Sequence, residues 1–383
     1  MSELYPCDQY RYADLLTDAE RAVLARLRGV LDTRVRPLLD DHWERGEFPH
    51  QVLPDLVGLN LMDHDGALYA GFRTFELART DASVATMYNA QSGLFRATIL
   101  RGGTPQQAAE LDPQVRSFAL TGVFALTEPD HGSDIAGGLA TTTRRDGDSW
   151  VIDGAKRWIG GADTADVLAV FARDVADGQV KAFLVPRSAD GVRVAKIGGK
   201  TSLRMVQNAD VTLAGVRVDE SARLGNVNSF RDVAELLRMT RSDVAWIACG
   251  VQAGAYGAAL RYTRGRSQFG RPVAGFALVQ EKLARMLAHL TASLGLAVRL
   301  TQLQEAGIYR DEDSALAKMA TSLHMRETVA LAREVVGGNG ITLATDVARF
   351  HADAEAVYSY EGTHEINALV VGRSVTGLSA FTR

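Results

Sequence analysis

The residue best suited to acid–base chemistry lies near the C-terminus, in the stretch Tyr358–Asn367 (YSYEGTHEIN). Glu361 sits between two segments with helical periodicity, so a break between helices could aim its carboxylate into a cavity. The following Gly362 permits an unusual backbone angle or the close approach of a flat ligand. The alternative interpretation, a loop glutamate that caps the next helix, is the commoner role for such a residue in isolation. Glu361 is therefore a candidate base that the rest of the chain must support.

Two other motifs suggest chemistry that their context does not support. Gly198–Thr201 (GGKT) resembles the end of a phosphate-binding loop, but Val194 occupies the place of that motif's first glycine. Glu361 and His364 have the i, i+3 spacing of di-iron helix bundles, which need a second such pair on another helix. The other Glu-x-x-His runs, Glu47–His50 and Glu128–His131, each contain a proline and do not fit a helix interior. The sequence therefore predicts neither a phosphate-binding loop of this kind nor a metal site.

Three segments could contact a planar cofactor, although each also has a simpler structural interpretation. Gly337–Gly340 (GGNG) follows a long helical pattern and is either a helix cap or a backbone platform for a bulky cofactor. Thr127–Asp134 (TEPDHGSD) is either a polar turn after an apolar strand or a loop that binds the edge of a heterocycle. Lys156–Gly161 (KRWIGG) places Trp158 at a strand end, where it could cover a ring system.

Hydrophobic periodicity divides the chain into three parts. Helical spacing, with a capping box at Thr17–Glu20 that starts a helix running to about Leu39, predicts a helical domain over residues 1–117. Residues 118–228 carry short β-branched strands, the first at 119–126, and predict a small barrel or sandwich. Residues 229–383 return to helical stretches long enough for a four-helix bundle. Asp-Gly pairs predict hairpin turns in the middle part: Asp146-Gly147, Asp153-Gly154, Asp177-Gly178 and Asp190-Gly191.

Composition narrows the functional classes. The 383 residues carry a formal net charge of -4, which predicts no surface for nucleic acid. Cys7 and Cys249 lie far apart and form no disulfide framework, so a reducing cytoplasm is the expected compartment. The N-terminus has no apolar core of secretory type, and no run of 18 apolar residues predicts a membrane span.

Taken together, these motifs resemble those of the acyl-CoA dehydrogenase family over essentially the whole chain. The resemblance rests on the order and spacing of several runs: 126–134 (LTEPDHGSD), 153–159 (DGAKRWI), 266–272 (RSQFGRP), Gln280, 336–340 (VGGNG) and 360–365 (YEGTHE). Within the family the chain is most similar to the branch of glutaryl-CoA dehydrogenase and the plant short-chain acyl-CoA oxidase. The resemblance implies a helical domain, a β-barrel domain and a four-helix bundle, as the periodicity also predicts.

The resemblance further implies FAD, held between the β domain and the C-terminal bundle, and a homo-oligomer, usually a tetramer, whose subunits share cofactors. The residues implied at the isoalloxazine ring are Phe124, Leu126, Thr127, Trp158 and Ile159. Those implied at the far end of a neighbouring subunit's cofactor are Arg266, Phe269, Gln280, Glu334, Gly337 and Gly338, with Thr363 and Glu365 following the catalytic acid. Those implied at the substrate are Ser133, Arg241, Ala85 and Gly362.

By the same resemblance Glu361 is the catalytic base, which removes the α-proton of an acyl thioester while the β-hydrogen leaves as hydride to flavin N5. Some relatives carry their base at the position that matches Thr240. Threonine cannot serve as that base, which leaves Glu361 as the candidate.

Two departures from the family pattern bear on the substrate and the electron acceptor. Ala85 stands where glutaryl-CoA dehydrogenase has an arginine for the distal carboxylate, which disfavours a glutaryl substrate. Gly160 stands where most dehydrogenases have a threonine beside flavin N5, which suggests easier access of O2 to the reduced flavin.

The leading interpretation is an acyl-CoA dehydrogenase or oxidase for a short or medium, straight or branched acyl group on coenzyme A or an acyl-carrier protein. Electron-transferring flavoprotein or O2 is the expected acceptor. The alternatives are a flavin-dependent monooxygenase of secondary metabolism on the same fold and a non-catalytic flavoprotein. The presence of Glu361 argues against both.

Overall fold

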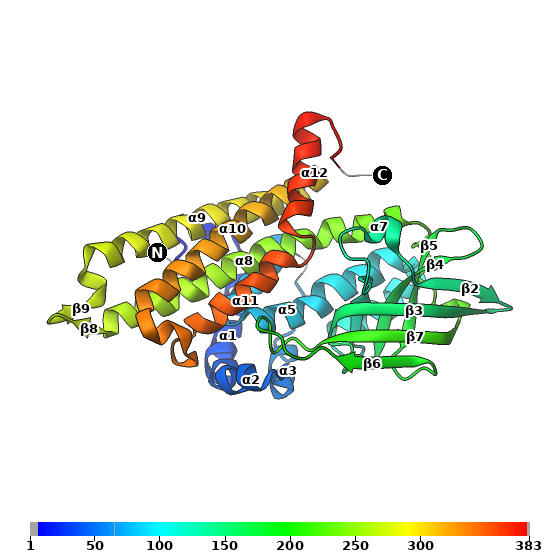
Figure 1. The fold of residues 1–383 in the computed structure, drawn as a ribbon, viewed down its shortest axis with the longest axis horizontal. Helices are drawn as coiled ribbons and strands as arrows, with labels where there is room; N and C mark the ends of the chain where they lie inside the picture. The colour runs from blue at the N-terminus through cyan, green and yellow to red at the C-terminus, as the bar shows by residue number, and fades with distance from the viewer. Residues whose placement is uncertain (1–6, 65, 381–383) are drawn as a thin grey trace. The chain divides into compact units, whose positions relative to one another are not determined.

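The computed structural model describes residues 7–64 and 66–380. The N-terminal hexapeptide, which carries part of the prediction that no secretory signal is present, lies outside these residues. Contacts within the chain form two compact units. Unit 1 comprises the described parts of residues 1–86, 201–205 and 241–383, and unit 2 comprises residues 87–200 and 206–240 (Figure 1). The boundaries at 117 and 228 stay a prediction.

Unit 1 is helical. Its helices are α1 (Asp18–Val30), α2 (Leu39–Arg45), α3 (Leu53–Val57), α4 (Ala67–Thr80), the first part of α5 (Ala82–Asn89), α8 (Phe230–Gly265) from Arg241 onward, α9 (Ala277–Glu305), α10 (Asp311–Val336), α11 (Val347–Ser359) and α12 (His364–Thr376). The predicted capping box is confirmed, with Thr17 and Glu20 exchanging hydrogen bonds. The predicted helical segment is confirmed, since the backbone is helical from Asp18 to Arg45, but it is not one regular α-helix: α1 ends at Val30, and π- and 3-10-helical turns follow up to Leu38. Pro37 in this segment lacks the N–H that a regular helix needs.

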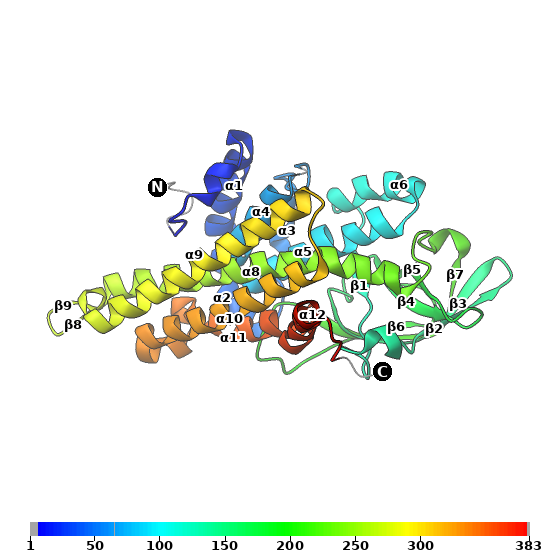
Figure 2. The same ribbon diagram turned by 90° about the horizontal axis from the view of Figure 1, so that it is seen from above.

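The C-terminal half of unit 1 is built on long helices, as the periodicity predicts. α9 and α10 run side by side, and α11 packs against α10 (Figure 2). Gly71 lets α4 approach α8, since a Cβ there would lie 2.2 Å from the Trp246 ring. α9 is the one described helix long and apolar enough to cross a membrane. This is weak evidence for a span, because the core helix of a water-soluble protein passes the same test.

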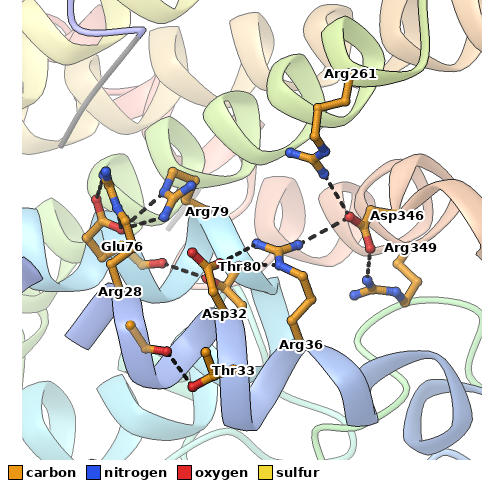
Figure 3. Close-up of polar contacts among 11 residues, drawn as sticks. Arg28, Asp32, Thr33, Arg36, Glu76, Arg79, Thr80, Arg261, Asp346 and Arg349 are labelled. Carbon is orange, nitrogen blue, oxygen red and sulfur yellow. Dashed lines mark hydrogen bonds and ion pairs between the residues drawn. The ribbon is translucent and has the colours of Figure 1, made fainter. Parts of the chain in front are cut away.

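A network of ion pairs joins the N-terminal helices of unit 1 to its C-terminal helices (Figure 3). Glu76 of α4 is fully buried and binds Arg28 of α1 and Arg79. The similarly buried Arg349 of α11 binds Asp40 and Asp81, along with Asp346. Buried charges are tolerated when they are paired in this way. The pairs of Arg349 with Asp40 and Asp81 link segments of unit 1 that are far apart in sequence.

Asp353 of α11 anchors a distant segment of chain and makes unit 1 sensitive to pH. Its Oδ1 accepts hydrogen bonds from Leu203 N (2.7 Å) and Trp43 Nε1 (3.2 Å). Burial, together with the neighbouring Asp81, raises the pKa of Asp353 to about 7. A carboxyl that ionises at higher pH in the folded state binds more protons there than in the unfolded chain. Its contribution therefore falls as pH rises from about 4 to 7.

We expect the Asp353→Asn variant to lose part of this pH dependence. The wild-type protein should lose up to about 1.4 kcal/mol of unfolding free energy per pH unit through Asp353 between pH 5 and 7. Asparagine still accepts from Leu203 N and carries no charge, so its stability should vary less over the same range. Urea unfolding at pH 5, 6, 7 and 8 measures both slopes. Parallel curves for the two proteins would contradict the assignment.

Unit 2 is a seven-stranded sheet with helices on one face. The strands are β1 (Gly122–Ala125), β2 (Thr142–Asp146), β3 (Ser149–Gly160), β4 (Val167–Asp174), β5 (Val180–Pro186), β6 (Val192–Lys196) and β7 (Asn208–Asp219), accompanied by α6 (Pro105–Arg116) and α7 (Ile135–Gly138). The sheet order is β1-β4-β2-β3-β7-β6, with β5 on β4. Asp146-Gly147 and Asp177-Gly178 form the predicted turns, with φ of 64° and 70° at the glycines.

Three predictions about this sheet are wrong. Asp190-Gly191 makes no hairpin turn, because it connects β5 to β6, and these strands pair with β4 and β7 rather than with each other. The first strand is shorter than the predicted 119–126, since it covers only Gly122–Ala125. Asp153-Gly154 makes no turn, because it lies inside β3 at an irregularity in the pairing with β7. Gly154 is required there for another reason: its φ is 152° and a Cβ would lie 2.5 Å from Thr141 Oγ1.

Candidate functional site

Glu361 lies in the short connection between α11 and α12, as the sequence predicts. Its backbone is left-handed, with φ of 54°, and Gly362 follows with φ of 89°. A non-glycine residue in this region costs on the order of 1–3 kcal/mol and persists where surrounding contacts impose it. The Glu361 side chain is half-buried. The carboxylate is thus carried by a strained turn between two helices, clear of the solvated face of either.

Several contacts hold the turn around Glu361. Thr363 caps α12 by accepting a hydrogen bond from Ile366 N (3.3 Å). Asn367 Nδ2 donates to the carbonyls of Gly362 and Thr363, each at 2.9 Å. Lys318 Nζ donates to the carbonyls of Tyr358 (2.6 Å) and Gly362 (2.7 Å). The backbone on both sides of Glu361 is therefore fixed.

Charged groups surround the same turn. Burial lowers the pKa of Lys318 to about 8, while the nearby carboxylates of Glu361 and Glu365 favour its charged form and Arg241 opposes it. The exposed Glu365, in the first turn of α12, has a lowered pKa because it accepts hydrogen bonds from backbone and Thr363. The predicted residues Arg241 and Glu365 therefore lie within electrostatic range of the Glu361 turn.

Two residues of α5 complete the surroundings of this turn within unit 1. Tyr360 OH lies 3.4 Å from Thr86 Oγ1, and burial raises the pKa of this phenol. Ala85 is fully buried and belongs to the same turn of α5 as Thr86. The position therefore carries a methyl group inside unit 1 and no charge that could bind a second carboxylate.

The residues predicted at the far end of a cofactor gather at the opposite end of the long helices. Arg266 and Phe269 lie on the hairpin of β8 (Ser267–Gln268) and β9 (Arg271–Pro272), where Phe269 is 94% exposed. Lys282 Nζ of α9 lies 2.5 Å from Glu334 Oε2 of α10, which brings the exposed Gln280 and Glu334 to the same end.

Gly337 caps α10 with φ of 66° and donates its N–H to the Glu334 carbonyl, so the predicted cap is confirmed. A Cβ at Gly337 or Gly338 would meet no other atom within 4 Å, which leaves the backbone open to a ligand as well. Asn339 Nδ2 donates to Tyr262 OH and ties this loop to α8. The hairpin, the α9 start and the glycine loop thus form one exposed tip.

In unit 2 a β-bulge brings Trp158 beside the segment Thr127–Asp134, here called the Thr127 loop. The pairing of β3 with β7 shifts between Lys156 and Ile159, and Trp158 has φ of 65°. Asn208 Nδ2 donates to the Trp158 carbonyl (3.1 Å), and Arg157 N donates to the Thr127 carbonyl (2.8 Å). Bulges commonly re-aim side chains beside functional sites. Trp158 is 51% exposed, so its ring is available to cover a ligand.

A buried ion pair between Lys156 and Glu128 supports the Thr127 loop. Lys156 Nζ donates to Glu128 Oε1 (2.8 Å) and to the Leu126 carbonyl (3.1 Å). Glu128 also accepts from the N–H groups of Ala140 (2.6 Å) and Thr141 (2.9 Å). Burial lowers the pKa of Lys156 to about 8. Burial alone would raise the pKa of Glu128, but Lys156 and these donors hold it below its usual value.

The remaining predicted residues of unit 2 differ in exposure. Leu126 and Ile159 have buried side chains in the two core clusters on opposite faces of the sheet, so only their backbones can meet a ligand. Phe124 is half-buried and packs on Phe171 with ring centroids 4.6 Å apart. Ser133 is exposed in the loop before α7.

These residues fit a flavin. Unit 2 offers a half-exposed indole beside a polar loop, and unit 1 offers an arginine, an exposed aromatic and an open glycine backbone at one tip. Within the described residues no group of three or more His, Cys, Asp or Glu could hold a metal ion.

The sequence did not predict a role for Lys318 or for the Lys156–Glu128 pair. The signal for Lys318 was a lone lysine among the buried positions of α10, next to Ala317.

Comparisons with known proteins show what this chain is similar to. Three family models match in order: the acyl-CoA dehydrogenase N-terminal domain at residues 17–118, the middle domain at 123–216 and the C-terminal domain at 230–376. The mitochondrial short-chain specific acyl-CoA dehydrogenase of Bos taurus is 33% identical over 300 residues, covering 77% of this chain and 73% of that protein. A subunit of the caffeyl-CoA reductase–Etf complex of Acetobacterium woodii is 28% identical over 348 residues, covering 87% and 92%.

The structure is also similar to solved ones. Glutaryl-CoA dehydrogenase from Mycobacterium smegmatis matches with a TM-score of 0.93 and 32% identity, over 99% of this chain and 100% of that one. A second structure of a glutaryl-CoA dehydrogenase from that organism, in complex with FADH2, matches with the same TM-score and coverage at 30% identity. The predicted fold, cofactor and enzyme class are thereby confirmed. The chain belongs to the acyl-CoA dehydrogenase family of oxidoreductases, which act on the CH–CH group of acyl-CoA, and its cofactor is FAD.

Proposed function

We propose that this protein desaturates a short or medium acyl thioester at the α,β bond, with Glu361 as the base. The observation that carries the proposal is the Glu361 turn: an acidic side chain on a left-handed backbone, fixed on both sides and close to the buried Lys318 ammonium. A structural cap would need none of this strain. A base must be held in reach of the proton that it removes, which a fixed turn achieves.

The remaining residues of the chain bind and orient in this proposal. Bound FAD supplies the acceptor for the β-hydride when Glu361 takes the α-proton, which leaves a carbon–carbon double bond. Trp158 would cover the flavin ring system, and the Thr127 loop would contact its edge. Ser133 and Arg241 would contact the thioester or its pantetheine arm. The Glu361 N–H stabilises the charge on the thioester carbonyl, an effect worth about 3 kcal/mol per donor in comparable sites.

We also propose a homo-oligomer, with a tetramer as its form, and the separation between the Glu361 turn and the exposed tip of unit 1 supports this. Lys318, beneath the Glu361 turn, and Glu334, at the exposed tip, are 16 residues apart on α10, or about 24 Å at 1.5 Å per residue. The tip residues Arg266 and Phe269 are exposed, so the cofactor of a neighbouring subunit could bind to them.

Ala85 supports a monocarboxylic acyl group. A glutaryl chain would bring a second carboxylate to a position that offers no arginine, and an unpaired buried charge is costly. We therefore propose an unbranched or branched acyl chain of short to medium length, carried on coenzyme A or on an acyl-carrier protein.

Gly160 supports the proposal that O2 competes with electron-transferring flavoprotein as the acceptor, because it has no hydroxyl group where most dehydrogenases have a threonine beside flavin N5. A Cβ at Gly160 would lie 3.2 Å from Val206 Cγ1 and 3.6 Å from Asn208 Nδ2, so a larger residue would crowd the bulge that carries Trp158.

The cytoplasm is the proposed compartment, because Cys7 and Cys249 are both free and buried.

Anaerobic mixing of the FAD-loaded protein with a panel of acyl-CoAs tests the proposed function. We expect butyryl-CoA, isobutyryl-CoA or hexanoyl-CoA to bleach the flavin absorbance at least about tenfold faster than glutaryl-CoA, because glutarate would leave a charged group unpaired. Air or electron-transferring flavoprotein is then added to the bleached protein. Enoyl product with hydrogen peroxide supports an oxidase, and enoyl product only with flavoprotein supports a dehydrogenase. A hydroxylated product, or no bleaching with any acyl-CoA or acyl-carrier protein, contradicts the proposal.

A further inference from the structure

Lys318 is a charged residue on the buried face of a core helix. It lies on α10 next to the buried Ala317, one turn from the buried Thr321, and its own side chain has no exposed surface. A buried ammonium is strongly unfavourable unless it is fully bonded. An apolar residue would satisfy the packing of α10, so the lysine calls for another explanation.

The contacts of Lys318 are directed at one target. Nζ donates to the Tyr358 carbonyl at 2.6 Å, in the last turn of α11, and to the Gly362 carbonyl at 2.7 Å, just before α12. These carbonyls stand on the two sides of Glu361. The Tyr358 carbonyl is one of the terminal groups that a helix leaves without an intrahelical partner, and a cation is favourable at that end.

The charges around Lys318 agree with this role. Glu361 and Glu365 attract its ammonium, and Arg241 repels it. On the outer side Arg326 stacks on the Tyr358 ring with its guanidinium carbon 4.4 Å from the centroid, and the same ring lies 5.9 Å from Lys318 Nζ. Coulomb attraction acts equally on both partners, so a Lys318 that is held charged by Glu361 also favours the ionised carboxylate of Glu361.

We infer that Lys318 is a positioning residue for proton abstraction, which fixes the Glu361 turn through both flanking carbonyls and favours the ionised base. The inference rests on the proposed function, because it assumes that Glu361 takes the proton. Asn367 Nδ2 also binds the Gly362 carbonyl, so the turn retains a second support when Lys318 is changed. The role of Lys318 can therefore be separated from folding.

The test measures α-deprotonation by itself. An acyl-CoA in which sulfur replaces the β-carbon, such as (ethylthio)acetyl-CoA, can lose its α-proton but has no β-hydride to give. Washout of its α-hydrogens into D2O, followed by mass spectrometry, reports the base alone. The proteins compared are the FAD-loaded wild type and its Lys318→Met, Lys318→Gln and Glu361→Gln variants, with Ser322→Ala as a control. Ser322 is buried on the same helix, and its hydroxyl bonds only the Met319 carbonyl of that helix among the contacts described.

We expect Lys318→Met to slow washout at least tenfold, with unchanged FAD content and less than a threefold change in the concentration of analogue needed for half-maximal rate. The acid limb of its pH profile should move to higher pH, because the ionised base has lost its cation. Lys318→Gln keeps an N–H donor group but no positive charge and should be intermediate, and Ser322→Ala should match the wild type.

Wild-type washout in Lys318→Met would overturn the inference, as would a loss in which FAD content falls in proportion. If Lys318→Met does not fold, Lys318→Gln decides by the same criteria with a threefold threshold. Failure of the proposed function has a separate signature, since Glu361→Gln would then exchange α-hydrogen as fast as the wild type. Loss of washout in Glu361→Gln with full washout in Lys318→Met rejects the role of Lys318 alone.

Discussion

Replacement of Glu361 by glutamine is expected to slow anaerobic bleaching of the flavin by acyl-CoA about 10³-fold or more. A positioned general base typically contributes 10²–10⁴-fold, and the amide of glutamine cannot accept the α-proton. Glutamine has nearly the same shape as glutamate, so the left-handed backbone, the Lys318 hydrogen bonds and the FAD content should remain. Stopped-flow absorbance of the FAD-loaded variant measures the effect.

Glu355→Gln is the matched control for this substitution. Glu355 lies on α11, the helix that precedes the turn, and forms an ion pair with Arg326 on the exposed surface. Its replacement removes one negative charge close to the site and leaves the hydrogen bonds of Lys318 and Asn367 to the turn in place, so its bleaching rate should stay within about twofold of the wild type, as expected for an exposed pair. Bleaching by Glu361→Gln at the rate of Glu355→Gln would place the base elsewhere in the chain.

The fold could be predicted where a local rule acts alone. Thr17–Glu20 starts a helix because its two side chains satisfy their own backbone, and Asp146-Gly147 turns because the flanking strands pair with each other. Asp153-Gly154 carries the same sequence signal, yet its glycine serves the close approach of Thr141, the residue just before β2. The difference between these pairs lies in the register of strands, which no single dipeptide contains.

The candidate site shows the same division. The position of Glu361 between two helices could be predicted from helical periods that stop on either side of it. The supports of the site could not, because they bridge long sequence separations: Lys318 reaches the turn from 40 and 44 residues away, and Lys156 binds Glu128 from 28. A lysine inside an apolar helical pattern signals a buried charge. Its partner becomes visible only when α10 and α11 are packed.

The second large effect is expected from Lys156→Met in unit 2. Lys156 and Glu128 are both buried, and removal of the ammonium leaves the Glu128 carboxylate in the core with only the N–H groups of Ala140 and Thr141. Breaking a buried pair by removing one partner typically costs about 3–5 kcal/mol. The Leu126 carbonyl loses a donor as well, so the loop that carries Thr127 should loosen and FAD content should fall.

Two comparisons separate the buried charge from lost packing. In the double variant Lys156→Met with Glu128→Gln no charge remains unpaired, so a large part of the stability should return, and the cycle of single and double variants measures the coupling. The exposed pair of Arg217 with Asp146 gives the matched control, because Arg217→Gln should cost less than about 1 kcal/mol. Urea unfolding, followed by tryptophan fluorescence, to which Trp150 and Trp158 of this sheet contribute, reports each variant. Equal losses in the single and double variants would show that Lys156 acts through its volume, and the ion pair would then have no part in supporting the Thr127 loop.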